Sequence, residues 1–237
     1  MKRPSAWRGL AALLWVAAFT QAHAHDAISN DARKAYMSKL EVLQRTVQSN
    51  ALPSARAVAF FETGKTLDEI RGLLNEDVVS HGKPQGLETA VLIHELNAKY
   101  TLQVSPHTRL YLADLKPYRE SLKLDPRGKQ APQARFLILK NHFYDSFVDN
   151  PIRPLQQTKA TLLEMIESGE SLLSVRDAGV DSEEVHFILA IHYLQAADSG
   201  AHPKEKTQAR FGELLKKFRS TWPASLKLAT LEALSSK

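Results

Sequence analysis

The most specific chemistry in this sequence belongs to the two histidines of the segment His23-Ala24-His25. If the chain is cut after Ala24, His25 becomes the first residue, and its free amine and imidazole can chelate Cu(II) through two nitrogens. A cut after Ala22 would instead leave a histidine in third position, which is another copper-chelating arrangement. The alternative is that both histidines are incidental parts of a leader. We therefore keep His25 as the candidate metal ligand, although the sequence names no second ligand and indicates no other cofactor.

A second group of candidate residues is aromatic and lies in the middle of the chain. Tyr111, Tyr118 and Tyr144 each combine a polar tip with an apolar body, which suits a groove for a peptide or a glycan. Arg135 is expected to lie at the rim of such a groove. The alternative is that this region packs the core, because its apolar residues recur at strict helical spacing: Phe136, Leu139, Phe143 and Phe147.

Several short patterns match part of a catalytic motif but lack one of its required residues. Gly64-Lys65-Thr66 resembles the end of a phosphate loop, but the glycine required five positions earlier is replaced by Ala59. His94-Glu95 begins like a zinc-protease helix, but Ala98 stands where the second histidine is needed. The sequence contains no Gly-x-Ser-x-Gly elbow and no cysteine. These absences favour a protein without catalytic function.

Two other groups of ionisable residues are explained without a ligand. His186 and His192 are six residues apart, so on one helix they point about 120° apart and share no chelating face. We expect one partly buried imidazole and one surface imidazole. Acidic residues from Asp177 to Glu184 precede a predicted helix, whose dipole favours negative charge. Their spacing lacks the turn glycine and alternating oxygen ligands of a calcium loop.

The first 24 residues have the pattern of a secretory signal peptide. Lys2, Arg3 and Arg8 precede an apolar run from Leu10 to Phe19, and small residues follow at Ala22 and Ala24. The apolar run has about ten residues, whereas a membrane span needs about 20, and no later segment is long enough. We expect residues 1–24 to be removed and the mature chain to be periplasmic or secreted, with no lipid anchor on a cysteine.

The composition fits a folded globular chain. Hydrophobic residues make up 43% and charged residues 24%, which excludes disorder, and the absence of cysteine excludes disulfides and iron–sulfur clusters. Loss of Lys2, Arg3 and Arg8 with the leader lowers the formal net charge from +5 to +2. No run of five or six like charges occurs. Nucleic acid and an anionic membrane are therefore not expected as leading partners.

Apolar residues recur with the helical period along nearly the whole mature chain. We expect Leu110 to Leu122 to be helical with a kink or a break at Pro117, residues 101–106 to be irregular or briefly extended, and residues 125–132 to form a loop. Start signals mark the other helices: Asn30, Thr66, Gly86, Thr158, Asp181, Pro203 and Pro223. The sequence thus predicts a single all-α domain over residues 25–237, built from eight to ten helices in stacked hairpins, with any subdivision near residues 125–133.

In the C-terminal third, an aromatic-led helix that carries Phe211 and Phe218 ends at a Trp222-Pro223 corner, and a helix rich in small residues follows. Upstream, the segment from Ala190 to Leu194 pairs a small residue with an aromatic one. Residues 182–234 therefore resemble the tetratricopeptide-like repeats of exported bacterial proteins, although Arg219 replaces the usual proline. No 34-residue repeat of this pattern is found upstream of this segment. The resemblance implies an α-solenoid whose hairpins form a binding surface.

These observations together predict an exported, non-enzymatic helical scaffold that binds a protein or peptide partner in the cell envelope. The alternative is a periplasmic helical protein that binds a small ligand or copper through His25. Neither nucleic acid nor a membrane span of the mature chain is part of either expectation.

Overall fold

The computed structural model describes residues 28–149 and 158–235. This part of the chain contains nine α-helices and no strand, apart from an isolated antiparallel bridge between Val104 and Tyr111. The all-α prediction and the expected number of helices are confirmed. The helices are α2 (Asn30–Gln48), α3 (Pro53–His81), α4 (Leu87–Lys99), α5 (Lys116–Leu124), α6 (Ala131–Asp149), α7 (Lys159–Leu172), α8 (Ser182–Ser199), α9 (Lys204–Thr221) and α10 (Leu226–Ser235).

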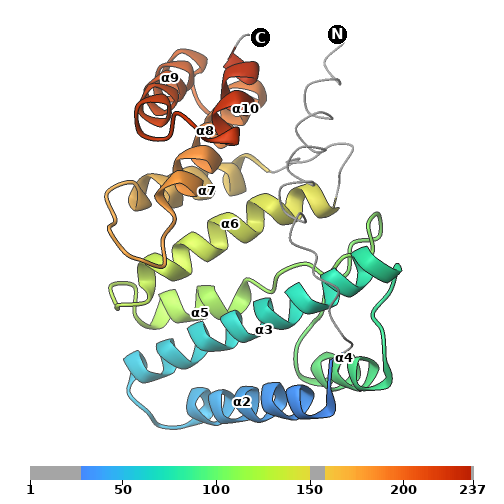
Figure 1. The fold of residues 1–237 in the computed structure, drawn as a ribbon. Helices are drawn as coiled ribbons and strands as arrows, with labels where there is room; N and C mark the ends of the chain where they lie inside the picture. The colour runs from blue at the N-terminus through green and yellow to red at the C-terminus, as the bar shows by residue number, and fades with distance from the viewer. Residues whose placement is uncertain (1–27, 150–157, 236–237) are drawn as a thin grey trace.

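The helices stack in chain order. Helix α2 packs on α3, α3 on α5, α5 on α6, and the contacts continue in sequence to α10, while α4 lies beside α2 (Figure 1). Apart from α4, each helix therefore contacts mainly the helices next to it in this order, which is the arrangement of an α-solenoid. None of the described helices is both long enough and apolar enough to cross a membrane.

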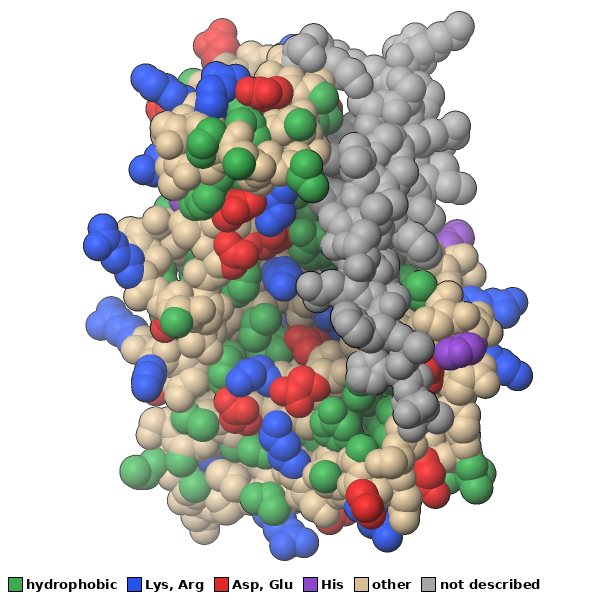
Figure 2. Space-filling view, viewed as in Figure 1, with side chains coloured by type: hydrophobic (Ala, Val, Ile, Leu, Met, Phe, Trp, Pro, Cys, Tyr) green, Lys and Arg blue, Asp and Glu red, His purple; other side chains and the backbone are tan. Residues whose placement is uncertain are grey.

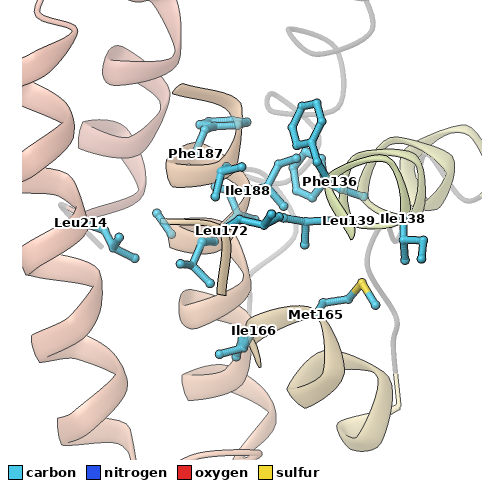
Figure 3. Close-up of a cluster of buried hydrophobic side chains, with 14 of the residues drawn as sticks. Phe136, Ile138, Leu139, Met165, Ile166, Leu172, Phe187, Ile188 and Leu214 are labelled. Carbon is cyan, nitrogen blue, oxygen red and sulfur yellow. The ribbon is translucent and has the colours of Figure 1, made fainter. Parts of the chain in front are cut away.

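Two hydrophobic clusters fill the stack. The smaller cluster joins α2, α3 and α4 with Leu110 and Tyr111, and the larger one extends from Phe61 of α3 through α5 to α10. Figure 3 shows part of the larger cluster, where apolar side chains of α6 meet those of α7 and α8. The four apolar residues at helical spacing on α6 are all buried, which confirms the core interpretation: Phe136, Leu139, Phe143 and Phe147.

Several predicted helix starts are confirmed by capping contacts. The hydroxyl of Thr158 accepts a hydrogen bond from the Thr161 N–H at 3.2 Å, and the Asp181 carboxylate accepts one from the Glu184 N–H at 3.1 Å. These bonds satisfy donors that the first helical turn leaves free. Two starts are shifted. Ser29 rather than Asn30 caps α2, and α10 begins at Leu226 rather than Pro223.

The predicted start at Thr66 is wrong, because α3 runs without a break from Pro53 to His81. Thr66 is buried inside this helix, and its hydroxyl donates a hydrogen bond of 2.8 Å to the Glu62 carbonyl one turn earlier. A threonine hydroxyl can satisfy either a helix start or the carbonyl four residues back. The real start is Pro53, a residue that loses no helical bond in the first turn.

The predicted helix from Leu110 to Leu122 is also wrong in its first half, since α5 begins only at Lys116. Asn75 of α3 accounts for the difference. Its side chain accepts a hydrogen bond from the Tyr111 N–H at 2.7 Å and donates one to the Tyr111 carbonyl at 3.0 Å. The backbone N–H and carbonyl of Tyr111 therefore bond to the Asn75 side chain instead of to the backbone of a helix that includes Tyr111. The irregular stretch at residues 101–106 and the loop before α6 are as predicted.

Candidate functional site

A pocket of about 260 Å³ lies where α2, α3, the end of α4 and the start of α5 meet. We call it the α2–α5 pocket. Its lining comes from four separate segments of the chain: Gln44, Val47 and Gln48; Phe60 and Thr63; Lys99, Tyr100 and Thr101; and Asp114, Lys116 and Pro117.

Backbone contacts at the helix ends hold these segments in place. Tyr100 ends α4 in an extended conformation, and its N–H donates to the Leu96 carbonyl at 2.6 Å. The Arg56 Nε donates to the Val47 carbonyl at 3.0 Å, which ties α3 to the last turn of α2. The Asp114 carboxylate accepts a hydrogen bond of 2.9 Å from the Lys116 N–H at the start of α5. The pocket is thus framed by helix ends whose backbone groups are satisfied.

The lining combines apolar walls with polar groups that have no partner. The side chains of Gln44, Gln48 and Lys116 and the hydroxyl of Tyr100 make no hydrogen bond or ion pair with any residue of the described ranges. Lys99 differs, because its ammonium donates to Glu41 at 3.1 Å. Burial raises the pKa of Tyr100, so its phenol stays neutral and can donate. An apolar pocket with a few free polar groups is the usual form of a binding site.

Tyr111 and Tyr118, predicted to line a partner groove, are instead buried. Tyr118 is 0% exposed, and its hydroxyl donates to the Asp68 carboxylate at 2.7 Å. The Tyr118 ring lies so close to α3 that a Cβ on Gly64 would come within 2.7 Å of it. Gly64 therefore serves helix packing, and the groove prediction fails for both tyrosines because a buried ring cannot contact a partner at the surface.

The other two predicted partner-binding residues have separate intramolecular contacts. The Tyr144 hydroxyl donates to Glu184 of α8 at 2.5 Å, and Lys227 of α10 pairs with the same carboxylate. Arg135 donates through Nη2 to the Pro126 carbonyl at 2.7 Å. The structure therefore does not gather the four predicted residues on one surface. Arg135 is the one charged residue of the four, and its carbonyl partner does not neutralise that charge.

A partly buried ionic cluster, which the sequence did not indicate, connects α3 and α6. Arg71 donates to the carboxylate of Asp145 at 3.0 Å and to the amide oxygen of Asn141 at 3.2 Å. Asp68 lies 3.4 Å from the Arg71 Nε and accepts a 2.7 Å hydrogen bond from Asn141. The cluster holds two carboxylates and one guanidinium. Although the Arg71 Nε is buried without a hydrogen bond, the other bonds close the cluster and make it a brace between helices rather than an open site.

Asp145 makes the stability of this cluster depend on pH. Burial raises its pKa to about 6 from a usual value of 3.8, although the Arg71 charge and the Ala113 N–H oppose the rise. A carboxyl whose pKa is higher in the folded state stabilises the fold at low pH, and this contribution is lost as the pH rises through 6.

His192 makes stability depend on pH in the opposite direction. The imidazole is fully buried, its Nδ1 lies 2.8 Å from the Ile188 carbonyl, and its Nε2 has no hydrogen-bond partner among the described residues. Burial lowers its pKa to about 4 from 6.5. Its contribution to stability is therefore complete above pH 6.5 and is lost as the pH falls through 4.

Burial also lowers the pKa of His142 and of His186 from 6.5, so their contributions add to that of His192 and oppose that of Asp145. Relative to the wild type, Asp145→Asn should therefore make the unfolding free energy rise more steeply with pH between about pH 4 and pH 6.5, and His192→Asn should shift the slope in the opposite direction, each by a total of about 3 kcal/mol over this window. Urea unfolding of the three proteins at several pH values measures the slopes. Identical slopes in all three would contradict the assignment.

The predicted metal ligands receive no support from the described residues. His25 lies outside them, so copper binding there stays a prediction. No group of three His, Asp or Glu side chains in the described ranges could hold a metal ion. His186 and His192 are 7% and 0% exposed, so the expectation of a surface imidazole is wrong. Both rings lie among core side chains, because α8 is covered by neighbouring helices on several sides.

The sequence did not indicate the α2–α5 pocket. Its lining residues come from segments with no characteristic spacing. The only related signal in the sequence was the run Lys99-Tyr100-Thr101, where one helical pattern ends and the irregular stretch begins. Comparison with known proteins adds no assignment, since no family model, no curated protein and no solved structure matches this chain. The geometry of the described residues is therefore the basis for a functional proposal.

Proposed function

We propose that this chain is an exported, non-enzymatic helical scaffold that binds a protein or peptide partner in the cell envelope, and that the α2–α5 pocket receives part of that partner. The observation that carries the proposal is the set of free polar groups around apolar walls in this pocket. Stacked helical hairpins commonly provide such binding surfaces.

The size of the pocket favours a piece of a peptide over a complete small ligand. Pockets for drug-sized ligands have volumes of about 300–1,000 Å³, whereas this pocket measures about 260 Å³. One or two side chains fill such a space. Phe60 and Tyr100 supply apolar area for an anchoring side chain, while Gln44 and Gln48 can bond to the peptide groups beside it.

A substitution that fills the pocket tests this proposal. We expect peptides selected by the wild-type mature chain from a random phage-displayed library to bind Gln44→Trp at least about tenfold more weakly, because the indole occupies the space of the anchor. Fluorescence anisotropy with the selected peptides gives the affinities.

Val42→Trp is the matched control, since it adds the same side chain to the same helix at a position that is 59% exposed and outside the pocket lining. Circular dichroism should show that both variants keep the wild-type helix content. The proposal fails if the library yields no peptide, or if both variants bind the selected peptides as tightly as the wild type.

The export part of the proposal predicts a defined N-terminus. When the full chain is expressed in a Gram-negative host, the accumulated protein should be released with the periplasmic fraction and should begin at His25, because Ala22 and Ala24 occupy the small-residue positions of the cut site. N-terminal sequencing checks the position. Retention of Met1, or recovery with the cytoplasmic fraction, would contradict export.

A further inference from the structure

Positive charge is concentrated in one part of this chain. Residues 116–140 contain seven Lys and Arg but two Asp and Glu, whereas the chain without its leader carries a net charge of +2. These residues form α5, the following loop and the first half of α6. Two of the seven cations are neutralised by neighbours, since Arg119 pairs with Glu164 at 3.5 Å and Lys123 with Glu120 at 2.6 Å.

The free cations gather where two loops meet. Arg127 and Lys129 are exposed on the α5–α6 loop, and Arg176 is exposed on the α7–α8 loop. A hydrogen bond of 2.8 Å from the Gln133 side chain to Asp177 joins the first turn of α6, directly after the α5–α6 loop, to the α7–α8 loop. Figure 2 shows Lys and Arg side chains along this edge of the molecule, on the left of the view. We call Arg127, Lys129, Arg135 and Arg176 the basic edge.

Two acidic residues, Asp177 and Asp125, lie near the basic edge. Asp177 accepts hydrogen bonds from Gln133 and from the Gly179 N–H, which lower its pKa, and the charge of Lys129 adds to that effect. The Asp125 carboxylate lies against Gly128 and forms no hydrogen bond or ion pair with the described residues, so it offsets one of the four positive charges of the basic edge and leaves the edge positive.

Further along the chain, Asp181 caps α8, while Glu183 and Glu184 pair with Lys227. No acid in the first turn of α6 offsets the positive end of that helix. The guanidinium groups of Arg127 and Arg176 form no ion pair with any residue of the described ranges.

We propose that the basic edge docks an acidic segment of a partner protein. Cations on adjoining loops attract a complementary acidic surface and raise the rate of encounter. No large hydrophobic side chain of this edge is exposed, so it offers nothing to insert into a lipid bilayer. The inference rests on the proposed function in one respect, the nature of the partner, and it concerns a surface that shares no residue with the α2–α5 pocket.

Charge reversal tests the inference on the mature chain. The probe is a fluorescein-labelled peptide of about ten glutamates, with a glutamine peptide of equal length as the neutral comparison. We expect the wild type to prefer the glutamate peptide, and the triple variant Arg127→Glu, Lys129→Glu, Arg176→Glu to bind it at least about tenfold more weakly at low salt. The preference should weaken as salt is added.

Three exposed lysines of α9 give a control with the same change in net charge: Lys204→Glu, Lys206→Glu and Lys216→Glu. This control should bind the glutamate peptide within about twofold of the wild type, as should Gln44→Trp. Equal losses in the edge variant and the α9 control would overturn the inference, since net charge alone would then explain binding. Binding to phosphatidylglycerol vesicles but not to the peptide would overturn it in favour of a membrane.

Discussion

Replacing Phe143 with alanine should lower the free energy of unfolding by about 3–5 kcal/mol. Phe143 is 0% exposed. Its ring centroid lies 5.1 Å from the ring centroid of Phe147, 5.2 Å from that of Tyr144 and 6.0 Å from that of Phe187. These contacts join α6 to α8 at the centre of the larger core cluster. Truncation removes the transfer energy of the ring and leaves a cavity that surrounding helices cannot close. Urea unfolding followed by circular dichroism measures the loss.

Two companion variants make this prediction specific. Phe143→Leu should lower the free energy of unfolding by less than Phe143→Ala does, because leucine fills part of the same space. Val42→Ala removes apolar atoms from a position that is 59% exposed and should change stability by no more than about 0.5 kcal/mol. If Phe143→Ala unfolds at the wild-type urea concentration, the ring does not have the core role described for it.

The second large effect is expected for Arg71→Met, which should lower the unfolding free energy by about 3–5 kcal/mol at pH 7. The substitution leaves Asp68 and Asp145 facing one another without their shared cation, and it removes a donor to Asn141. The loss should shrink near pH 4.5, because Asp145, whose pKa burial already raises to about 6, is then protonated and needs no cation. Urea unfolding at both pH values measures the difference.

Arg119→Met is the matched control for Arg71→Met. Its ion pair with Glu164 is 3.5 Å long, and both side chains are about half exposed, at 46% and 56%. Surface pairs of this kind contribute about 1 kcal/mol or less. A loss as large in Arg119→Met as in Arg71→Met would show that burial does not distinguish the two arginines. A loss for Arg71→Met that does not depend on pH would remove Asp145 from the explanation.

Local sequence signals predicted the helices well where the signal had one structural meaning. The caps at Thr158 and Asp181 and the apolar face of α6 follow from contacts within one or two helical turns. Thr66 shows the limit of such signals. Its hydroxyl can cap a helix start or bond back to a carbonyl, and the long helix α3 uses the second option because its packing continues on both sides of that residue.

The sequence predicted the candidate site much less well than it predicted the helices. Tyrosine was a reasonable residue type for a binding surface, but Tyr118 is buried because Gly64 lets its ring pack against the α3 backbone and Asp68 accepts its hydroxyl. Tyr100, which does line the pocket, has the same chemical character as Tyr118. The side chain alone does not tell them apart. What separates them is the position of α2, which meets the end of α4 and leaves a pocket there.

The sequence by itself determined the all-α class, most helix starts, the apolar face of α6 and the absence of cysteine chemistry, because each depends on residue type or on spacing within a few helical turns. Tertiary structure decided the α2–α5 pocket, the ionic cluster around Arg71 and the meeting of the two loops at the basic edge. In each of these, groups from distant segments come together through helix packing. Asn75 shows the reason most simply, since its side chain takes the backbone bonds of Tyr111, 36 residues away, and a periodic pattern carries no information about a partner at that distance.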